Sequence, residues 1–362
     1  MKKKLLFSAY SLEIGGIETS LIALLKCIDY TKYDVTLVLE KKEGMFLNQI
    51  PDNVQVFEYI SNKNENPLIR KFLNLFKRIQ FALKYKNKYD FAGSFATYSR
   101  PGSFVARTAS KNNCLWIHTD YMTLYNNDIF LVEQFLNNIQ YKQFKNVIFV
   151  SNKSKEAINN LFVENKQKVY MIKNIIDYKE ILTKSNEEIE LKKEDCVTFL
   201  NVSRHDEHSK KLTRIIEVAR RLKDEEHKFK ILFIGDGKDT DIYKELIEKE
   251  KLEDIIILLG AKDNPYPYFK ISDCILLSSD YEGYPVVFAE AFVMNLPIIT
   301  TEVSDSKEDV ANKFGIVTEK NVEDIYINMK KFIEEGFEIK ESFDAEQYNK
   351  KTMEQLEKMW NM

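Results

Sequence analysis

The feature that most constrains the fold is a regular alternation of short apolar runs, rich in β-forming residues, with longer amphipathic segments along the whole chain. This alternation is typical of parallel sheets whose strands are joined by helices that cover both faces. In the first half the expected strands are residues 4–10, 34–39, 55–60, 115–118, 147–151 and 169–173. In the second half they are residues 197–202, 229–235, 255–259, 274–279 and 297–301. We therefore expect an α/β protein with two doubly wound, Rossmann-like sheets.

The length of the chain also predicts two domains, because 362 residues are more than one hydrophobic core usually serves. Residues 178–195 are dense in Lys and Glu and lack a strong core pattern, so we expect the boundary and a hinge there. The C-terminal stretch has apolar residues at helical spacing, which predicts a final amphipathic helix. The expected parts are residues 1–177, residues 178–343 and a helix over residues 344–362.

Composition narrows the class of protein. The chain is 44% hydrophobic and 30% charged with a net charge of -3, which gives no global case for nucleic-acid binding. The four cysteines stand singly inside apolar runs, which indicates buried thiols in a reducing compartment. No run approaches the ~18 apolar residues of a membrane-spanning helix. We expect a cytoplasmic protein that can touch a membrane without crossing it.

Open parallel sheets bind ligands beyond the carboxyl ends of their strands, so residues that follow an apolar run are candidates for a site. One such segment is Gly235-Asp236-Gly237, which follows an expected strand. Glycines without β-carbons would let a ligand approach the backbone, but a plain turn is at least as good an interpretation.

Two glutamates follow a later strand. Glu282 lies in the loop Asp280 to Pro285, and Glu290 lies in the helix expected to begin near Pro285. The free N–H groups of that helix would form a seat for phosphate. Glu290 falls on an otherwise apolar face, where hydrogen bonds from a ribose diol would stabilise its carboxylate. A salt bridge or a helix cap is the structural alternative.

Two cations, Arg204 and Lys210, follow the strand that ends at Val202, and Lys211 adjoins them. The local pattern offers them no carboxylate, so they suit a diphosphate. A solvated charge cluster is the alternative.

Taken together, these motifs resemble those of the group 1 (family 4) retaining glycosyltransferases of GT-B fold. That family carries an arginine, a lysine, a glycine-rich turn and a Glu-x7-Glu motif in the order found here. The first half agrees, with Gly15-Gly16 after the first strand and His118 at the end of a later one. The resemblance covers nearly the whole chain. It implies that the first domain binds the acceptor and the second a nucleotide-sugar. It also implies that the C-terminal helix, residues 344–362, packs back onto the first domain.

The resemblance also implies roles for individual residues. Arg204 and Lys210 would grip the donor diphosphate, with Lys211 as an alternative to Lys210. Glu290 would bind the ribose hydroxyls, and Glu282 the transferred sugar. Further positions that the resemblance places near the ligands are Gly235, Gly237, Gly283, Tyr284, Pro285, Gly15, Gly16 and His118. One departure is Asn295, which stands where the family usually has a glycine.

The function expected from the resemblance is transfer of a hexose-type sugar from a nucleotide diphosphate donor, with UDP as a family-level inference. The acceptor would be a cell-envelope glycan, with a lipid-linked capsular or exopolysaccharide intermediate favoured. No cofactor is expected. Metal-free transfer with retention is expected, because Asp239-Thr240-Asp241 opens an expected helix where acidic residues act as caps. His205 and His208 lack a third metal ligand and are expected on a loop surface.

Three other functions share parts of this pattern. A sugar-nucleotide epimerase would have the same fold, and donor turnover without an acceptor would identify it. A non-catalytic glycosyltransferase-like subunit commonly loses a cation or a motif glutamate, whereas this chain keeps both. A nicotinamide oxidoreductase is disfavoured because the glycine fingerprint is incomplete.

A basic amphipathic segment, residues 67–90, suggests a membrane-facing surface. Seven Lys and Arg residues are interleaved with Leu, Ile and Phe against a single Asp. Such helices are attracted to anionic lipid. An ordinary core-packed helix with a solvated basic face is the alternative.

Overall fold

The computed structural model describes all 362 residues as two compact units. The first unit holds residues 1–175 and 349–362, and the second holds residues 176–348. The division falls two residues before the boundary expected from the sequence. Residues 178–184, expected to belong to a linker, form helix α7 (Tyr178–Lys184), whose Ile181 is buried in the second unit.

The first unit is built on a seven-stranded parallel sheet of order β3-β2-β1-β4-β5-β6-β7. Its strands are β1 (Lys3–Ala9), β2 (Tyr33–Leu39), β3 (Val54–Glu58), β4 (Phe91–Ser94), β5 (Asn113–Ile117), β6 (Asn146–Phe149) and β7 (Lys168–Met171). Its α-helices are α1 (Gly16–Cys27), α2 (Pro67–Tyr85), α3 (Arg100–Ala109), α4 (Tyr121–Leu124), α5 (Ile129–Asn138), α6 (Asn152–Val163) and most of α15 (Ala345–Trp360). Short 3₁₀ turns cover Met45–Gln49 and Tyr141–Gln143.

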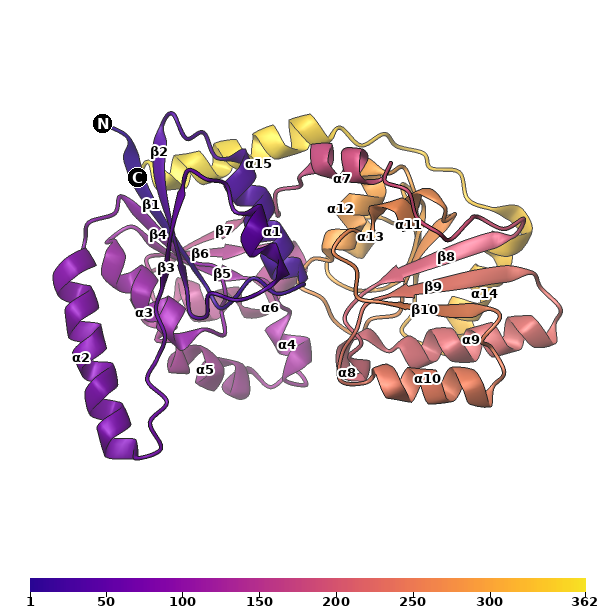
Figure 1. Cartoon of the computed structure of the whole chain (residues 1–362), viewed down its shortest axis with the longest axis horizontal. Helices are drawn as coiled ribbons and strands as arrows, with labels where there is room; N and C mark the ends of the chain where they lie inside the picture. The colour runs from indigo at the N-terminus through magenta and orange to yellow at the C-terminus, as the bar shows by residue number, and fades with distance from the viewer. The chain divides into compact units, whose positions relative to one another are not determined.

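The second unit repeats the plan with six parallel strands of order β10-β9-β8-β11-β12-β13 (Figure 1). They are β8 (Val197–Val202), β9 (Phe229–Ile234), β10 (Ile256–Gly260), β11 (Cys274–Leu277), β12 (Ile298–Thr301) and β13 (Gly315–Thr318). Its remaining helices are α8 (Glu207–Lys210), α9 (Leu212–Asp224), α10 (Thr240–Lys249), α11 (Tyr266–Lys270), α12 (Val286–Val293), α13 (Ser306–Asp309) and α14 (Val322–Glu335). Both sheets are doubly wound, as the alternation of the sequence predicts.

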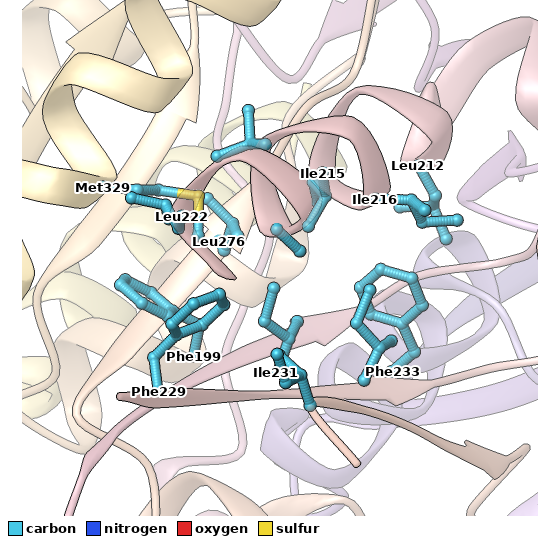
Figure 2. Close-up of a cluster of buried hydrophobic side chains, with 14 of the residues drawn as sticks. Phe199, Leu212, Ile215, Ile216, Leu222, Phe229, Ile231, Phe233, Leu276 and Met329 are labelled. Atoms are coloured by element: carbon cyan, nitrogen blue, oxygen red, sulfur yellow. The ribbon is translucent and has the colours of Figure 1, made fainter. Parts of the chain in front are cut away.

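The main core of the second unit lies between its sheet and the helices α9, α10 and α14. Figure 2 shows Ile215, Ile216 and Leu222 of α9 above Phe229 and Ile231 of β9. Helix periodicity places the three α9 side chains on one face, and the alternation of the strand turns both β9 side chains toward them. A smaller cluster on the opposite face joins α7, α11 and α12. The sheet is therefore fixed from both sides, and its loops extend from a rigid base.

Helix α15 is tied to the first unit through its last residues. The fully buried ring of Trp360 lies edge-on to Tyr33 at 5.3 Å and to Phe7 at 6.1 Å between ring centroids. Asn112 Nδ2 donates a hydrogen bond to the carbonyl oxygen of Met359 at 2.9 Å. The helix thus covers β1 and β2 on the face opposite Leu6, which belongs to a buried cluster with residues of α3, α5 and α6.

The four cysteines are free thiols, and the structure corrects the expectation that all are buried. Cys114 and Cys274 are buried, whereas Cys27 and Cys196 are half-buried. Burial raises the pKa of the Cys114 and Cys274 thiols, which keeps both in the neutral form. None of the helices combines the length and apolar character that crossing a bilayer requires.

Candidate nucleotide-sugar site

The candidate site of the second unit lies where the order of its sheet reverses. Strand β8 pairs with β9 on one side and with β11 on the other, so the loops after β8 and β11 leave the same edge in different directions. The two loops are joined directly, because the hydroxyl of Ser278 donates to the carbonyl oxygens of Lys210 at 2.8 Å and Lys211 at 2.9 Å. The candidate cations and candidate glutamates therefore share one edge.

The Lys210 ammonium forms an ion pair with Glu282, and the Ser279 hydroxyl donates to the same carboxylate oxygen at 2.8 Å. The Lys210 and Glu282 side chains are only 17% and 14% exposed. The local sequence pattern offers Lys210 no carboxylate, and the expectation of an unpaired lysine was wrong because Glu282 is supplied by the loop of another strand. A ligand diphosphate would have to share the lysine with this carboxylate.

The other two cations differ in their surroundings. Arg204 has a side chain that is 71% exposed, and its nearest carboxylate is Asp206 at 3.7 Å. Lys211 lies 3.7 Å from Asp280, which also binds Arg214 at 2.7 Å. Both cations therefore have acidic neighbours, again against expectation, but Arg204 keeps the most exposed charge.

Helix α12 begins at Val286 after Pro285, as the sequence predicts, and no side chain caps its N-terminus. Gly283, Tyr284 and Pro285, which lead into it, are buried. The carbonyl oxygen of Gly283 accepts a hydrogen bond from the Ser304 hydroxyl at 2.6 Å. This bond fixes the loop that places the uncapped helix end next to Glu282.

Glu290 is only 8% exposed, and it forms neither a salt bridge nor a helix cap. Its one protein partner is the Tyr266 hydroxyl, which donates to Oε1 at 3.2 Å. Burial raises the pKa of Glu290 to about 7, and the Tyr266 hydrogen bond opposes part of that shift. Both structural alternatives for this residue are therefore excluded, and its carboxylate has unused hydrogen-bonding capacity in an apolar setting.

The glycine turn after β9 serves the packing of the neighbouring loop. Gly235 has φ +148°, and a β-carbon there would stand 1.8 Å from the Ser203 carbonyl oxygen. A β-carbon on Gly237 would stand 2.3 Å from the His205 carbonyl oxygen. The two glycines thus allow the backbone of residues 203–205 to lie against the turn. The contacts favour the plain turn over a role of the glycines in admitting a ligand.

Asp239 and His205 both make hydrogen bonds within the second unit. Asp239 accepts a hydrogen bond from the Glu207 N–H at 2.7 Å, so its carboxylate helps to begin α8. His208 is exposed, as expected, but His205 is buried, with Nδ1 2.9 Å from the Thr240 hydroxyl. The expectation of a surface His205 was wrong because the glycine turn folds over it. No group of three or more His, Cys, Asp or Glu side chains in the chain is placed to hold a metal ion.

The departure at Asn295 has a conformational explanation. Asn295 has φ +53°, the left-handed region that favours glycine. Asparagine tolerates this region better than other residues that carry a side chain. The chain can therefore turn from α12 into β12 without the glycine usual in the family.

The remaining predicted residues belong to the first unit. Gly15 and Gly16 form the start of α1 after β1, and no side chain caps that helix. His118 follows β5 and packs against Phe95, with ring centroids 4.5 Å apart and planes tilted by 42°. Burial lowers the pKa of His118 to about 3, and its buried Nε2 has no hydrogen-bond partner. The imidazole is therefore neutral, and one of its ring nitrogens is buried without a partner in the protein.

Three residues of the second-unit site were missed from the sequence. Tyr266 reaches Glu290 from α11, Ser279 contacts Glu282, and Asp280 binds Arg214. Ser279 and Asp280 follow an apolar run, a signal that could have found them. Tyr266 lies in a short helix remote in sequence from Glu290, so no local pattern could have paired the two.

Comparison with known proteins agrees with this geometry. The model of the family described as "Glycosyl transferases group 1" matches residues 183–352. Among solved structures, Anabaena HepE in complex with UDP and glucose superposes with a TM-score of 0.75 at 17% identity, covering 98% of this chain and 99% of that one. The two doubly wound units thus have the GT-B fold. The second unit of this chain thus matches the group 1 glycosyltransferases.

Curated relatives extend the similarity beyond the second unit. The N-acetylgalactosamine-N,N'-diacetylbacillosaminyl-diphospho-undecaprenol 4-alpha-N-acetylgalactosaminyltransferase of Campylobacter jejuni is 28% identical over 92% of this chain and 91% of its own length. The UDP-Gal:alpha-D-GlcNAc-diphosphoundecaprenol alpha-1,3-galactosyltransferase of Escherichia coli is 23% identical over 87% of this chain and 84% of its own. An uncharacterized glycosyltransferase of Methanocaldococcus jannaschii is 26% identical, but the match spans 54% of this chain and 49% of that protein.

Proposed function

We propose that this glycosyltransferase moves a hexose-type sugar from a UDP-linked donor to a lipid-linked glycan of the cell envelope, with retention and without a metal ion. The observation that carries the proposal is that Lys210 is paired with Glu282 of the loop that leads to the uncapped N-terminus of α12, the helix that also holds the buried Glu290. Cation and helix end together suit a diphosphate, and the buried Glu290 suits a ribose diol.

The choice of donor and acceptor draws on the relatives. The Anabaena structure contains UDP and glucose, and the Escherichia coli relative is named for a UDP-galactose donor. The Campylobacter jejuni and Escherichia coli enzymes are both named for acceptors that carry diphosphate-linked undecaprenol. An acceptor sugar on a polyprenyl diphosphate is therefore the favoured substrate for this chain.

In the proposed reaction an acceptor hydroxyl oxygen bonds to the anomeric carbon while the bond from that carbon to the β-phosphate oxygen breaks. The proton of the hydroxyl passes to the departing phosphate oxygen on the same face of the sugar, so the anomeric configuration is retained. Arg204, Lys210 and the end of α12 would stabilise the charge that develops on the diphosphate. Glu282 would hold the sugar hydroxyls.

The test is a transfer assay with UDP-sugars and a short-chain polyprenyl diphosphate glycan. Arg204→Ala and Lys210→Ala should each lower kcat/KM by at least about a hundredfold. Lys249→Ala is the matched control, because Lys249 is a 74% exposed lysine at the end of α10, outside the proposed site. Unchanged turnover in both test variants would contradict the proposed site.

Full activity in EDTA is expected, and loss of activity that Mg²⁺ or Mn²⁺ restores would contradict the metal-free mechanism.

Helix α2 supports the further proposal that the protein binds an anionic membrane surface. Only Phe81 of this helix is buried, and it packs on Phe104 and Tyr59. Seven large apolar side chains on the other face are 47–80% exposed. They are Leu68, Ile69, Phe72, Leu75, Phe76, Ile79 and Leu83. An ordinary core-packed helix would not leave such a face in water, so an interfacial role is favoured.

The basic residues of α2 differ in their surroundings. Lys71 is exposed, whereas Lys77 donates to the Ile60 carbonyl oxygen at 2.9 Å and Arg78 lies over the Phe104 ring at 5.2 Å. Lys71 is therefore the better site for a charge test, because its replacement does not disturb the docking of the helix.

Vesicle flotation tests the proposed membrane contact. Phe72→Ser and Lys71→Glu should each reduce recovery with vesicles of phosphatidylglycerol and phosphatidylcholine several-fold. Ile327→Ser is the matched control, because Ile327 is a 49% exposed apolar residue on α14 of the second unit. Equal flotation of all four proteins would show that α2 does not bind the membrane.

A further inference from the structure

The first unit carries an aromatic pair at the switch point of its own sheet. Strand β1 pairs with β2 and β4, and Tyr10 follows β1 directly. Tyr98 follows β4, and the two rings lie 5.9 Å apart between centroids with planes tilted by 58°. The edge beyond β1 and β4 is where a doubly wound sheet binds ligands, and neither tyrosine belongs to the motifs described above.

Tyr98 is held in an exposed position by neighbours that are fixed. Thr97 and Ser99 are both only 2% exposed, whereas Tyr98 is 45% exposed. The Thr97 hydroxyl donates to the Trp116 carbonyl oxygen, and the Ser99 hydroxyl accepts the Gly102 N–H at 2.9 Å as the cap of α3. The ring is thus presented to solvent from a rigid backbone, which lowers the entropy lost when a ligand stacks on it.

Polar groups beside the pair suit a neutral sugar more than a charged ligand. Lys41 lies over the Tyr10 ring at 5.4 Å, but its charge is paired with Glu43 at 2.8 Å. Glu40 accepts the Ser99 hydroxyl at 2.9 Å through Oε2, and its Oε1 makes no hydrogen bond. An exposed aromatic face beside an open carboxylate oxygen offers stacking for C–H groups and an acceptor for hydroxyls, and a pyranose ring has both groups.

We propose that Tyr98, supported by Tyr10, stacks on a pyranose residue of the acceptor and that Glu40 accepts one of its hydroxyls. This inference rests on the proposed function, since it names the acceptor subsite of that reaction. The part assigned to Tyr98 is recognition, so its loss should weaken acceptor binding and leave donor binding unchanged.

Saturation-transfer NMR with the methyl glycosides of glucose, galactose and N-acetylgalactosamine at millimolar concentration tests the subsite. At least one glycoside should receive saturation from the parent protein, and Tyr98→Ala should raise its Kd about tenfold. Tyr98→Phe should keep binding, because the ring remains. The matched control is Phe130→Ala, since Phe130 is a 69% exposed aromatic residue elsewhere in this unit.

A second measurement separates failure of the subsite from failure of the proposed function. UDP should raise the Tm of the parent and of Tyr98→Ala equally, because its proposed site lies in the second unit. Absence of saturation for all three glycosides, or equal Kd values for the parent and Tyr98→Ala, would overturn the subsite. A parent protein that UDP does not stabilise would overturn the proposed donor instead.

Discussion

Glu290 illustrates how one residue can indicate a ligand. A carboxylate buried beside a single phenol costs stability in the folded protein, since burial disfavours its charged form. The cost makes sense if hydroxyl groups of a ligand complete its hydrogen bonds. Glu290 forms no salt bridge, which also distinguishes it from Glu282, the carboxylate that is paired with Lys210.

Glu290 therefore predicts a pH dependence of stability. Its pKa is raised from 4.5 to about 7 in the folded protein, so the unfolded chain loses this proton first as pH rises. Stability should fall between about pH 4.5 and pH 7 and then level off, with Glu290 contributing about 3 kcal/mol to the fall. Urea unfolding of the parent and of Glu290→Gln at pH 5 and pH 8 measures it. Glu290→Gln should have a higher free energy of unfolding than the parent at pH 8 but not at pH 5. The same difference between variant and parent at both pH values would contradict this account.

Replacing Gly235 should lower stability through backbone strain and close contact. Gly235→Ala would combine φ +148° with a contact of 1.8 Å to backbone, so it should lower the free energy of unfolding by about 3 kcal/mol. Gly336→Ala is the control, because Gly336 has φ +71° and open space around it. It should cost about 1 kcal/mol. Thermal unfolding monitored by circular dichroism compares the two, and equal losses would show that the close approach to Ser203 is unimportant.

At the scale of elements, two amphipathic helices with similar sequence patterns have different surroundings. Helix α15 buries Leu356, Met359 and Trp360, whereas α2 buries Phe81 alone. The apolar face of α15 is covered by the first unit, and that of α2 stays exposed. Periodicity predicts both helices, but the partner of each apolar face depends on which elements the fold brings to it.

Because α15 docks through Trp360, we expect replacement of this residue to lower the free energy of unfolding strongly. Trp360→Ala should lower the free energy of unfolding by about 3–5 kcal/mol, because it removes a fully buried ring from between Phe7 and Tyr33. Met362→Ala should be nearly neutral, since Met362 is 58% exposed. Chemical denaturation measures both variants. A loss below about 1 kcal/mol for Trp360→Ala would mean that α15 does not dock as the structure has it.

On the scale of the whole molecule, the chain contains two units that each have a doubly wound sheet and separate cores. A ligand that binds one unit should therefore protect that unit first. We predict that UDP slows hydrogen exchange in residues 203–211 and 280–290 and raises the stability of the second unit by about 2.7 kcal/mol at 100 times its Kd. Exchange mass spectrometry with and without UDP measures this. Protection confined to the first unit would contradict the assignment of the donor site.

The sequence by itself determined the fold class, because alternating apolar runs and amphipathic segments are local patterns that survive in any parallel α/β sheet. It missed β4 and β13, which have only four residues each and include a glycine. Short strands with small residues lack the apolar run on which the prediction depends.

The motif residues at strand ends could also be found from the sequence, since each follows its own strand. Only the tertiary structure decided their partners: Lys210 with Glu282, Glu290 with Tyr266, and Tyr10 with Tyr98. These pairs join segments far apart in the chain that meet because parallel strands end at one edge of a sheet. The tertiary structure also decided that Glu290 is buried and that α2 is exposed, because both depend on which neighbours the fold supplies.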